Sequence, residues 1–270
     1  MESQSSVHVF HPCPALQNFV SSYTVAYITG TQTWVRRQPA YPHQYLIFYP
    51  YEPQLHSNNG TDFHQLSKEL LIGPFTKPVY LLVTPSQLTI IVSLLPGALH
   101  RLTRLPLHEI LNQPLDGIDG FGVEMKRVNE RLSEAKTEEQ MIQLVEAFLL
   151  KKIQRVKELL PIDHTFILLM AEPCQYTIEQ LASLSCVSLR QFERQFMERI
   201  GTSPTMFIRQ ARFAKALRSK RIHPEFTWTE VAYQCGYFDQ MHFIRDFKQF
   251  TSATPSSFKN FVAASEITTA

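Results

Sequence analysis

Arg194 and Arg245 occupy the same place in two related segments of this chain. The pattern Phe-x-Arg-x-Phe occurs at 192–196 and recurs at 243–247, an offset of 51 residues. In a helix, the two phenylalanines of each copy lie on one side and the arginine points away from them. An arginine held outward in this way can donate two hydrogen bonds to a guanine in the major groove of DNA. The pattern therefore indicates nucleic-acid recognition rather than catalysis.

The similarity between the two segments continues upstream and downstream. Residues 177–182 match 227–232 at an offset of 50, whereas Pro204 recurs as Pro255 at an offset of 51. One residue has therefore been added between the two helices of the second copy. Internal similarity at a fixed spacing indicates one supersecondary unit used twice. We interpret that unit as helix, short turn, helix.

Capping signals predict where these helices begin. Three capping-box spacings are present, namely Thr177 with Gln180, Ser188 with Gln191, and Thr227 with Glu230. Ser203-Pro204 and Thr254-Pro255 place a cap residue before a first-turn proline, so a further helix is expected in each copy. Gly236 suits a helix end that needs positive φ, and it falls in the second turn.

The outward side of the second helix in each copy supplies the candidate DNA contacts. We assign base contacts to Arg190, Gln191, Glu193, Arg194, Gln240, Met241, His242, Ile244 and Arg245, and phosphate contacts to Ser188, Arg209 and Lys248. Met241 and Ile244 could meet thymine methyl groups or pack against protein. Leu189 is expected on the buried stripe of the first such helix. The acids Glu193 and Asp246 lie beside the reading positions and leave the base preference open.

Basic charge is concentrated around these helices. Residues 188–221 contain nine Lys or Arg and two Glu, a local charge of +7, whereas the whole chain carries +2. A local positive field of this kind favours contact with phosphates. The alternative is a solvated connecting helix, which we favour for Lys220 and Arg221 taken alone.

The run from about 161 to 261 resembles the DNA-binding domain of the AraC/XylS family of bacterial transcription regulators. The stretches that carry the resemblance are Ile178-Glu-Gln-Leu-Ala182, Phe192-x-Arg-x-Phe196, Gly201-Thr-Ser-Pro204, Arg212-x-x-x-Ala216, Val231-Ala232, Gly236-Tyr237, Phe243-x-Arg-x-Phe-Lys248 and Pro255-x-x-Phe258. The resemblance implies seven helices, with two helix-turn-helix units joined by a long helix. Each second helix would enter one of two successive major-groove segments.

The resemblance also implies a structural core and shows two departures from the family. The core residues are Leu181, Ala182, Phe192, Phe196, Gly201, Pro204, Phe207, Arg212, Ala232, Gly236, Phe243, Phe247, Pro255 and Phe258. Tyr237 stands where phenylalanine is common, a mild change. Ser219 stands where leucine is usual, so the long helix could end earlier.

The front of the chain has a different pattern. Short apolar runs bounded by Pro, Gly and Asn fill 1–120 and predict an antiparallel barrel or sandwich. Residues 10–150 are similar to the cupin-like N-terminal domain of some AraC-type regulators, chiefly through Pro96-Gly97, Pro106-Leu-x-Glu109 and Leu115. Five aromatic residues could line a barrel interior, and we interpret them as core rather than as a pocket. They are Trp34, Tyr45, Phe48, Tyr49 and Tyr51.

The expected fold class is α+β and multidomain. It combines a β-rich cupin-like barrel with an all-α domain containing two helix-turn-helix units. We divide the chain into a sensor or assembly domain (1–123), a helical linker or dimerisation segment (124–160), the double helix-turn-helix domain (161–262) and a tail (263–270). Residues 138–160 are amphipathic and are expected to pack against the barrel or a second subunit through an apolar stripe. The stripe contains Met141, Leu144, Val145, Phe148 and Leu149.

The sequence does not support a catalytic or metal site. No nucleophile elbow, phosphate loop or dinucleotide fingerprint is present, so we expect no catalytic residues, no cofactor and no metal. His8-x-x-His11-x-Cys13 has ligand-like residues without a fourth ligand. Cys186 and Cys235 are expected to be small buried residues in the two turns. The absence of a signal pattern and of a long apolar run favours a cytosolic protein.

These observations favour a sequence-specific DNA-binding transcription regulator. Its expected partners are double-stranded DNA, a small-molecule effector and a second copy of the chain, with RNA polymerase as a further partner if it is an activator. Two alternatives stay open. One is a metal-dependent cupin enzyme that carries a DNA-binding tail, and the other is an architectural DNA binder of low specificity.

Overall fold

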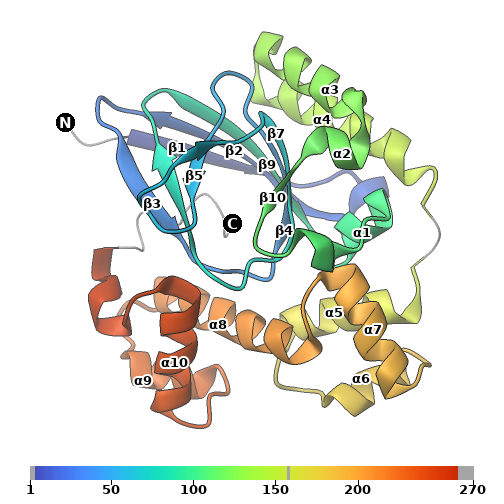
Figure 1. Cartoon of the computed structure of the whole chain (residues 1–270), viewed down its shortest axis with the longest axis vertical. Coiled ribbons are helices and arrows are strands. Elements are labelled where there is room, and N and C mark those ends of the chain that lie inside the picture. Colours follow the sequence, from blue (N-terminus) through green and yellow to red (C-terminus); the bar gives the residue numbers. More distant parts are fainter. Residues whose placement is uncertain (1–3, 157–158, 261–270) are drawn as a thin grey trace.

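The computed structural model describes residues 4–156 and 159–260. A β-rich front domain lies above a helical domain, and the helices labelled α5–α10 run beneath the sheets (Figure 1). The prediction of a β-rich domain followed by a helical domain with two helix-turn-helix units is confirmed. The assigned tail 263–270 lies outside the described residues.

Two antiparallel sheets form the front domain. The larger sheet has the order β1 (Gln4–Phe10), β2 (Val20–Thr29), β9 (Gln87–Leu94), β4 (Gln44–Phe48), β7 (Glu69–Ile72) and β10 (Pro114–Asp116). The smaller sheet has the order β3 (Trp34–Gln38), β8 (Val79–Val83), β5 (Leu55–Ser57) and β6 (His64–Gln65). The strand order is non-sequential in both sheets, so most hydrogen-bonded pairs join distant parts of the sequence.

Strand β4 shows how the larger sheet is buried on both faces. Leu46 and Phe48 pack with the helices that cover the outer face, whereas Tyr45 and Ile47 face the space between the two sheets. Successive side chains of a strand point to opposite faces, so each face receives alternate residues. Phe48 therefore belongs to the outer core rather than the barrel interior, and Tyr51 is exposed.

Short helices cover the outer face of the larger sheet. They are η1 (Pro14–Leu16), α1 (Ala98–Thr103), η2 (Leu107–Ile110), α2 (Gly117–Phe121), α3 (Val123–Glu134) and α4 (Glu138–Ile153). Helix α4 ends at Ile153, before the expected limit at 160. The α4 side chains Met141, Val145 and Phe148 are buried in the same core as β2, β4 and β9. The apolar stripe therefore packs on the front domain, which is the first of the two expected arrangements.

The helical domain is organised around one long helix. It contains α5 (Pro161–Ala171), α6 (Ile178–Leu184), α7 (Leu189–Ile200), α8 (Pro204–Ile222), α9 (Trp228–Gln234), α10 (Gln240–Thr251) and η3 (Pro255–Asn260). The two helix-turn-helix units, α6–α7 and α9–α10, lie at opposite ends of α8 (Figure 1). Helix α8 continues through Ser219 to Ile222, so the expected earlier end is wrong.

The capping signals act as predicted. Thr177, Ser188 and Thr227 each form a reciprocal capping box with the residue three positions later. Asp239 caps α10 by accepting a hydrogen bond from the His242 amide. Because the caps of α6 and α9 are 50 residues apart and those of α7 and α10 are 51 apart, the added residue lies in the turn between α9 and α10.

Both ends of the helical domain contact the front domain. At the second unit, the Ala40 amide donates to the Phe250 carbonyl at 2.9 Å, and Ala40 packs with Phe213 and Phe250. At the first unit, Gly201 has φ +88° and lies so close to Leu107 that an added Cβ would be 2.7 Å from the Leu107 carbonyl oxygen. Only glycine fits both the backbone conformation and the space at 201.

Candidate nucleic-acid interface

Helix α7 is anchored on one side and solvated on the other. Phe192, Phe196 and Ile200 are buried against α5 and α8 residues in the first helical core. The assigned base-contact residues of this helix are all exposed, namely Arg190, Gln191, Glu193 and Arg194. Leu189 is 41% exposed, so its expected place on the buried stripe is wrong. The stripe begins one turn later, at Phe192.

Helix α10 repeats this arrangement. Phe243, Phe247 and Phe250 are fully buried in the second helical core, where Trp228 and Phe213 pack against them. The assigned residues Gln240, Met241, His242, Arg245 and Lys248 are exposed, and Ile244 is half-buried. Arg194 and Arg245 therefore project from equivalent positions of two helices, each held by aromatic anchors.

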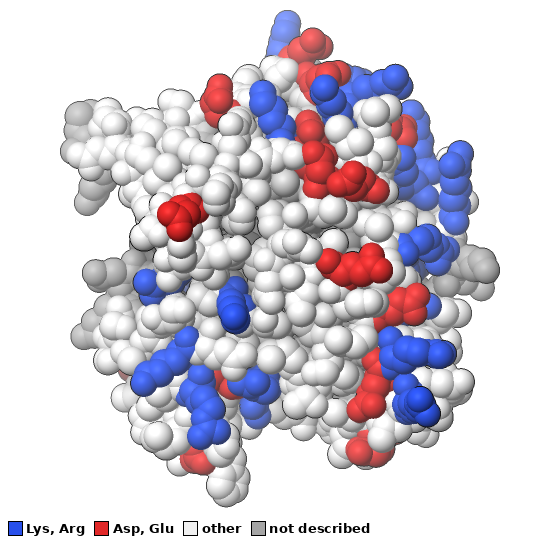
Figure 2. Space-filling model, in the orientation of Figure 1, with Lys and Arg blue, Asp and Glu red and all other residues white. Residues whose placement is uncertain are grey.

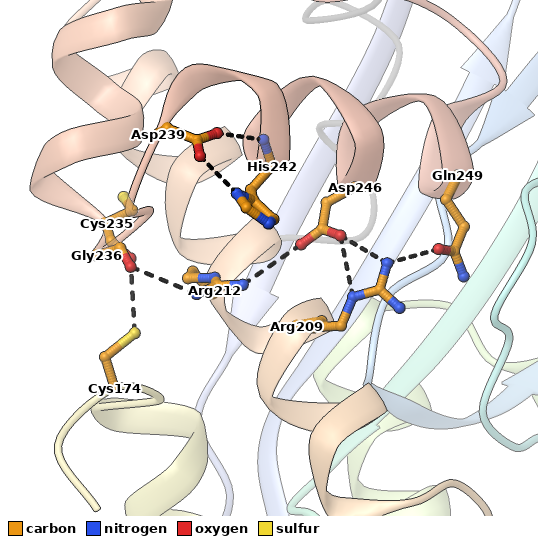
Figure 3. Close-up of polar contacts among 9 residues, drawn as sticks. All are labelled: Cys174, Arg209, Arg212, Cys235, Gly236, Asp239, His242, Asp246 and Gln249. Carbon is orange, nitrogen blue, oxygen red and sulfur yellow. Dashed lines mark hydrogen bonds and ion pairs between the residues drawn. The ribbon is translucent and has the colours of Figure 1, made fainter.

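Two of the residues assigned to base contacts are occupied by local hydrogen bonds. The Gln191 side-chain oxygen accepts from the Ser188 amide at 3.1 Å, which completes the capping box. The His242 Nδ1 lies 2.8 Å from an Asp239 carboxylate oxygen at the start of α10 (Figure 3). Each side chain would have to leave or share its partner to bind a base, so Arg194 and Arg245 are the stronger candidates.

Asp246 lies on the inner side of α10 and ties this helix to α8. Its carboxylate accepts from Arg209 Nη2 at 2.6 Å and Nε at 3.0 Å, and Arg212 Nη2 lies 3.6 Å from its second oxygen (Figure 3). The Gln249 side chain accepts a further hydrogen bond from Arg209. The expectation that Asp246 lies beside the reading positions is therefore wrong. Arg209 is engaged with Asp246 and Gln249, so it would have to leave or share these partners to contact a phosphate.

Tyr237 lies beside the ion-paired cluster of Asp246, Arg209 and Arg212. The Arg212 guanidinium carbon lies 4.2 Å from the centre of the Tyr237 ring, a cation–π contact. Burial raises the pKa of the Tyr237 hydroxyl well above its usual range, so this side chain is neutral. A tyrosine in place of the more common phenylalanine therefore adds a buried hydroxyl near the Arg212–Asp246 pair, and this hydroxyl has no hydrogen-bond partner among the described residues.

Internal pairing reduces the basic charge offered to a partner. At least six of the nine basic residues in 188–221 contact other protein groups, namely Arg199, Arg209, Arg212, Lys215, Lys220 and Arg221. Arg190, Arg194 and Arg218 stay exposed. Basic side chains lie over both ends of the helical domain, at the lower left and lower right of Figure 2, with acidic side chains among them. The charge of +7 counted from the sequence of 188–221 therefore exceeds the positive charge that stays unpaired at the surface of these helices.

Phe238 is the residue that sequence analysis missed. It occupies the added position between α9 and α10 and is 89% exposed, directly before the Asp239 cap. Met241 on the first turn of α10 and Tyr233 on α9 are also strongly exposed. The one-residue difference between the repeat offsets was the signal that could have singled out Phe238. An exposed aromatic residue at this point adds apolar contact area at the start of the second recognition helix.

The residues assigned to the structural core occupy interior or capping positions. The buried ones are Leu181, Ala182, Phe192, Phe196, Gly201, Pro204, Phe207, Ala232, Phe243, Phe247 and Pro255. Arg212 is half-buried, and Gly236 is exposed with φ +78° in the second turn. The side chain of Phe258 lies outside the described residues. Phe213 and Ala216 of α8 are also buried, although neither was assigned to the structural core.

The cysteine and histidine residues do not assemble a site in the described parts of the chain. Across 4–156 and 159–260, no three His, Cys, Asp or Glu side chains are grouped so that they could hold a metal ion. His8 instead pairs with Glu138 of α4 at 2.8 Å. Cys235 is buried as expected, but Cys186 is exposed and has φ +55°. None of the helices that the structure describes is both long and apolar enough to cross a membrane.

The fold and the two exposed recognition helices define a double helix-turn-helix protein. Residues 181–260 match the family model of a helix-turn-helix domain, and residues 8–116 match a domain of unknown function (DUF6597). The chain therefore carries a helix-turn-helix domain of the AraC/XylS type, as the sequence resemblance implies.

The similar proteins are transcription regulators. The chain is 32% identical over 83 residues to the uncharacterized HTH-type transcriptional regulator YdeC of Bacillus subtilis, covering 31% of this chain and 28% of YdeC. It is 32% identical over 77 residues to the transcriptional activator RhaS of Enterobacter, covering 28% of this chain and 27% of RhaS. The chain thus matches little more than a quarter of the length of these curated relatives. Among solved structures, ToxT of Vibrio cholerae superposes over 96% of this chain and 98% of its own, with 12% identity and a TM-score of 0.48.

Proposed function

We propose that this protein is a sequence-specific DNA-binding transcription regulator. The observation that carries the proposal is the pair Arg194 and Arg245, exposed at equivalent positions of α7 and α10 and backed by buried phenylalanines. Helix α8 joins the two units and contributes buried residues to the core of each, so one continuous helix connects the two recognition helices. In this proposal α7 and α10 enter successive major-groove segments on one face of the DNA.

The proposal assigns the individual contacts. Arg194 and Arg245 read bases, with Arg190, Gln240 and Met241 beside them, whereas Ser188 and Lys248 contact phosphates. Phe238 contributes apolar contact next to the second helix, because it is exposed at the start of α10. Glu193 would meet cytosine, the base that donates from an amino group in the major groove.

The front domain is proposed to sense a small ligand and has no catalytic role. A partly open cavity of about 100 Å³ lies between the sheets, and the wall residue Phe75 also packs against the second helical core. A change in the cavity can therefore reach the second helix-turn-helix unit through direct contact. Contact with RNA polymerase belongs to this proposal if the regulator activates transcription. A homodimer would have to use surfaces other than the buried α4 stripe.

Footprinting tests the proposal against low-specificity binding. The protein is expected to protect two major-groove segments about 34 Å apart on one face of its selected DNA site. Binding sites would first be selected from a randomised DNA pool. Equal affinity for selected and scrambled DNA would favour an architectural binder instead, and protection of a single groove segment would mean that one unit has only a structural role.

Substitution of the two arginines tests base reading. Arg194→Ala and Arg245→Ala are each expected to weaken binding to the selected site by about 1–3 kcal/mol. Each variant should relax the base preference in a different half of the site, because the two helices read different groove segments. The measurement is affinity for a panel of single-base variants. Arg218→Ala is the control, since Arg218 is an exposed arginine of α8 outside both recognition helices. Unchanged preference in both test variants would contradict the assignment.

A further inference from the structure

Arg36 of β3 is a buried cation in the wall of the front-domain cavity. The residue is 9% exposed and lines the cavity between the two sheets. In the part of the chain that the structure describes, no carboxylate forms an ion pair with Arg36, and its Nε has no hydrogen-bond partner. A buried charge without a partner is costly, and an arginine cannot escape the cost by losing its proton.

The other titratable groups around the cavity do not neutralise Arg36. Burial lowers the pKa of His43 to about 4 and also lowers the pKa of His56, so both imidazoles are neutral near pH 7. Burial raises the pKa of the Tyr41, Tyr45 and Tyr49 hydroxyls, so all three phenols are neutral as well. No Asp or Glu is among the described residues that line the cavity. The described cavity wall therefore carries one permanent positive charge and no negative charge.

The rest of the cavity wall favours a ligand with an apolar body. Most of the lining is aliphatic or aromatic, including Ile28, Ile47, Ile72 and Ile91. The glutamines among the lining residues partly satisfy one another, because Gln87 donates to Gln54 and Gln54 donates to the Leu82 carbonyl. A cavity near 150 Å³ can hold a benzene molecule, so the space of about 100 Å³ suits a compact group.

We propose that the front-domain cavity binds a small organic carboxylate, with Arg36 as the partner of the carboxylate and the isoleucine-rich wall around its apolar body. The proposal deepens the sensing role given above, since it names the chemical class of the ligand. A carboxylate matches the planar guanidinium fork and supplies the missing negative charge. A fully hydrophilic anion would leave the apolar wall without contacts.

Calorimetric titration of the full chain tests this site with matched probes. Propanoate and butanoate are compared with propanamide and butanamide, which have similar shape and no charge. We expect at least one acid to bind with a stoichiometry of one and about tenfold or more tighter than its amide, the ratio typical of a charged hydrogen bond. Methyl resonances of Ile28, Ile47, Ile72 and Ile91 should shift with the same saturation curve, since these side chains line the cavity.

Substitution of Arg36 identifies the group responsible. Arg36→Met should abolish the preference for acid over amide, whereas Arg36→Lys should retain part of it. Arg127→Met is the control, because Arg127 is exposed on α3 and does not line the cavity. Arg36→Met should also unfold at a higher denaturant concentration in the absence of ligand, since it removes an unpaired buried charge. This second readout shows that the variant is folded.

Several results would overturn the proposal. They are the absence of saturable binding by both acids, equal binding of acid and amide, an unchanged preference in Arg36→Met, or tighter binding of inorganic phosphate than of either acid. None of these measurements uses DNA. Loss of DNA binding with intact carboxylate binding would therefore count against the proposed regulator alone, and the reverse result would count against the cavity assignment alone.

Discussion

Asp246→Ala is expected to lower the free energy of unfolding by about 3 kcal/mol. The Asp246 side chain is 5% exposed and holds both Arg209 and Arg212, so its removal leaves two guanidinium groups without their carboxylate. The expected value is at the lower end of the range for breaking a buried ion pair, because both arginines keep some contact with water. Urea denaturation followed by circular dichroism measures the change.

The matched control is another acid of a recognition helix. Glu193→Ala on α7 removes an exposed carboxylate and should change the unfolding free energy by no more than about 0.5 kcal/mol. DNA affinity separates the two positions further. Loss of Asp246 should weaken DNA binding only through the reduced stability of the α8–α10 contact. If both substitutions had an equally small effect on the free energy of unfolding, this would contradict the role of Asp246 in holding α10 against α8.

The sequence predicted the features of the helical domain that depend on local pattern. Capping boxes use residues three positions apart, and the Phe192–Phe196 and Phe243–Phe247 spacings follow from the helical period. The repeat offsets also placed the added residue correctly in the second turn. Each of these signals spans a few residues, so no knowledge of distant partners was required.

The features that the sequence did not predict depend on tertiary contacts. Asp246 and Arg209 are far apart in the sequence, and only the crossing of α8 and α10 brings their side chains together. On a helix drawn alone, Asp246 could point toward DNA and Arg209 toward a phosphate. The paired contact turns both inward and leaves Arg245 as the outward-facing charge of α10.

The front-domain cavity was not predicted from the sequence, for a different reason. The run Tyr45-Leu-Ile-Phe-Tyr49 is apolar throughout, because one face of β4 packs on helices and the other lines the cavity. A strand buried on both faces shows no alternation of apolar and polar residues. Tyr45 and Tyr49 therefore line the cavity that the sequence interpretation gave to the core, and Arg36 was not singled out because arginine is rarely buried.

The contact between Ala40 and the second helix-turn-helix unit provides the other large expected effect. Ala40 is fully buried against Phe213 and Phe250, and its amide donates to the Phe250 carbonyl. Ala40→Asp is expected to weaken docking of this unit on the front domain by several kcal/mol, the effective cost of burying a carboxylate. Solution scattering should show a larger radius of gyration for this variant. Its circular dichroism spectrum should show unchanged helix and strand content.

Ala40→Gly is the matched control, because it removes one methyl group and adds no charge. It should keep the compact scattering profile and a single cooperative unfolding transition, whereas Ala40→Asp should unfold in two steps. The same pair of variants tests the coupling between the domains. If the front domain restrains the second unit through Ala40 and Phe75, Ala40→Asp should remove any effect of a cavity ligand on DNA affinity and leave binding of that ligand intact. The contrary result would be a compact Ala40→Asp variant whose DNA affinity still responds to the cavity ligand. The two domains would then be coupled through a different contact, such as the one between Gly201 and Leu107 at the first unit.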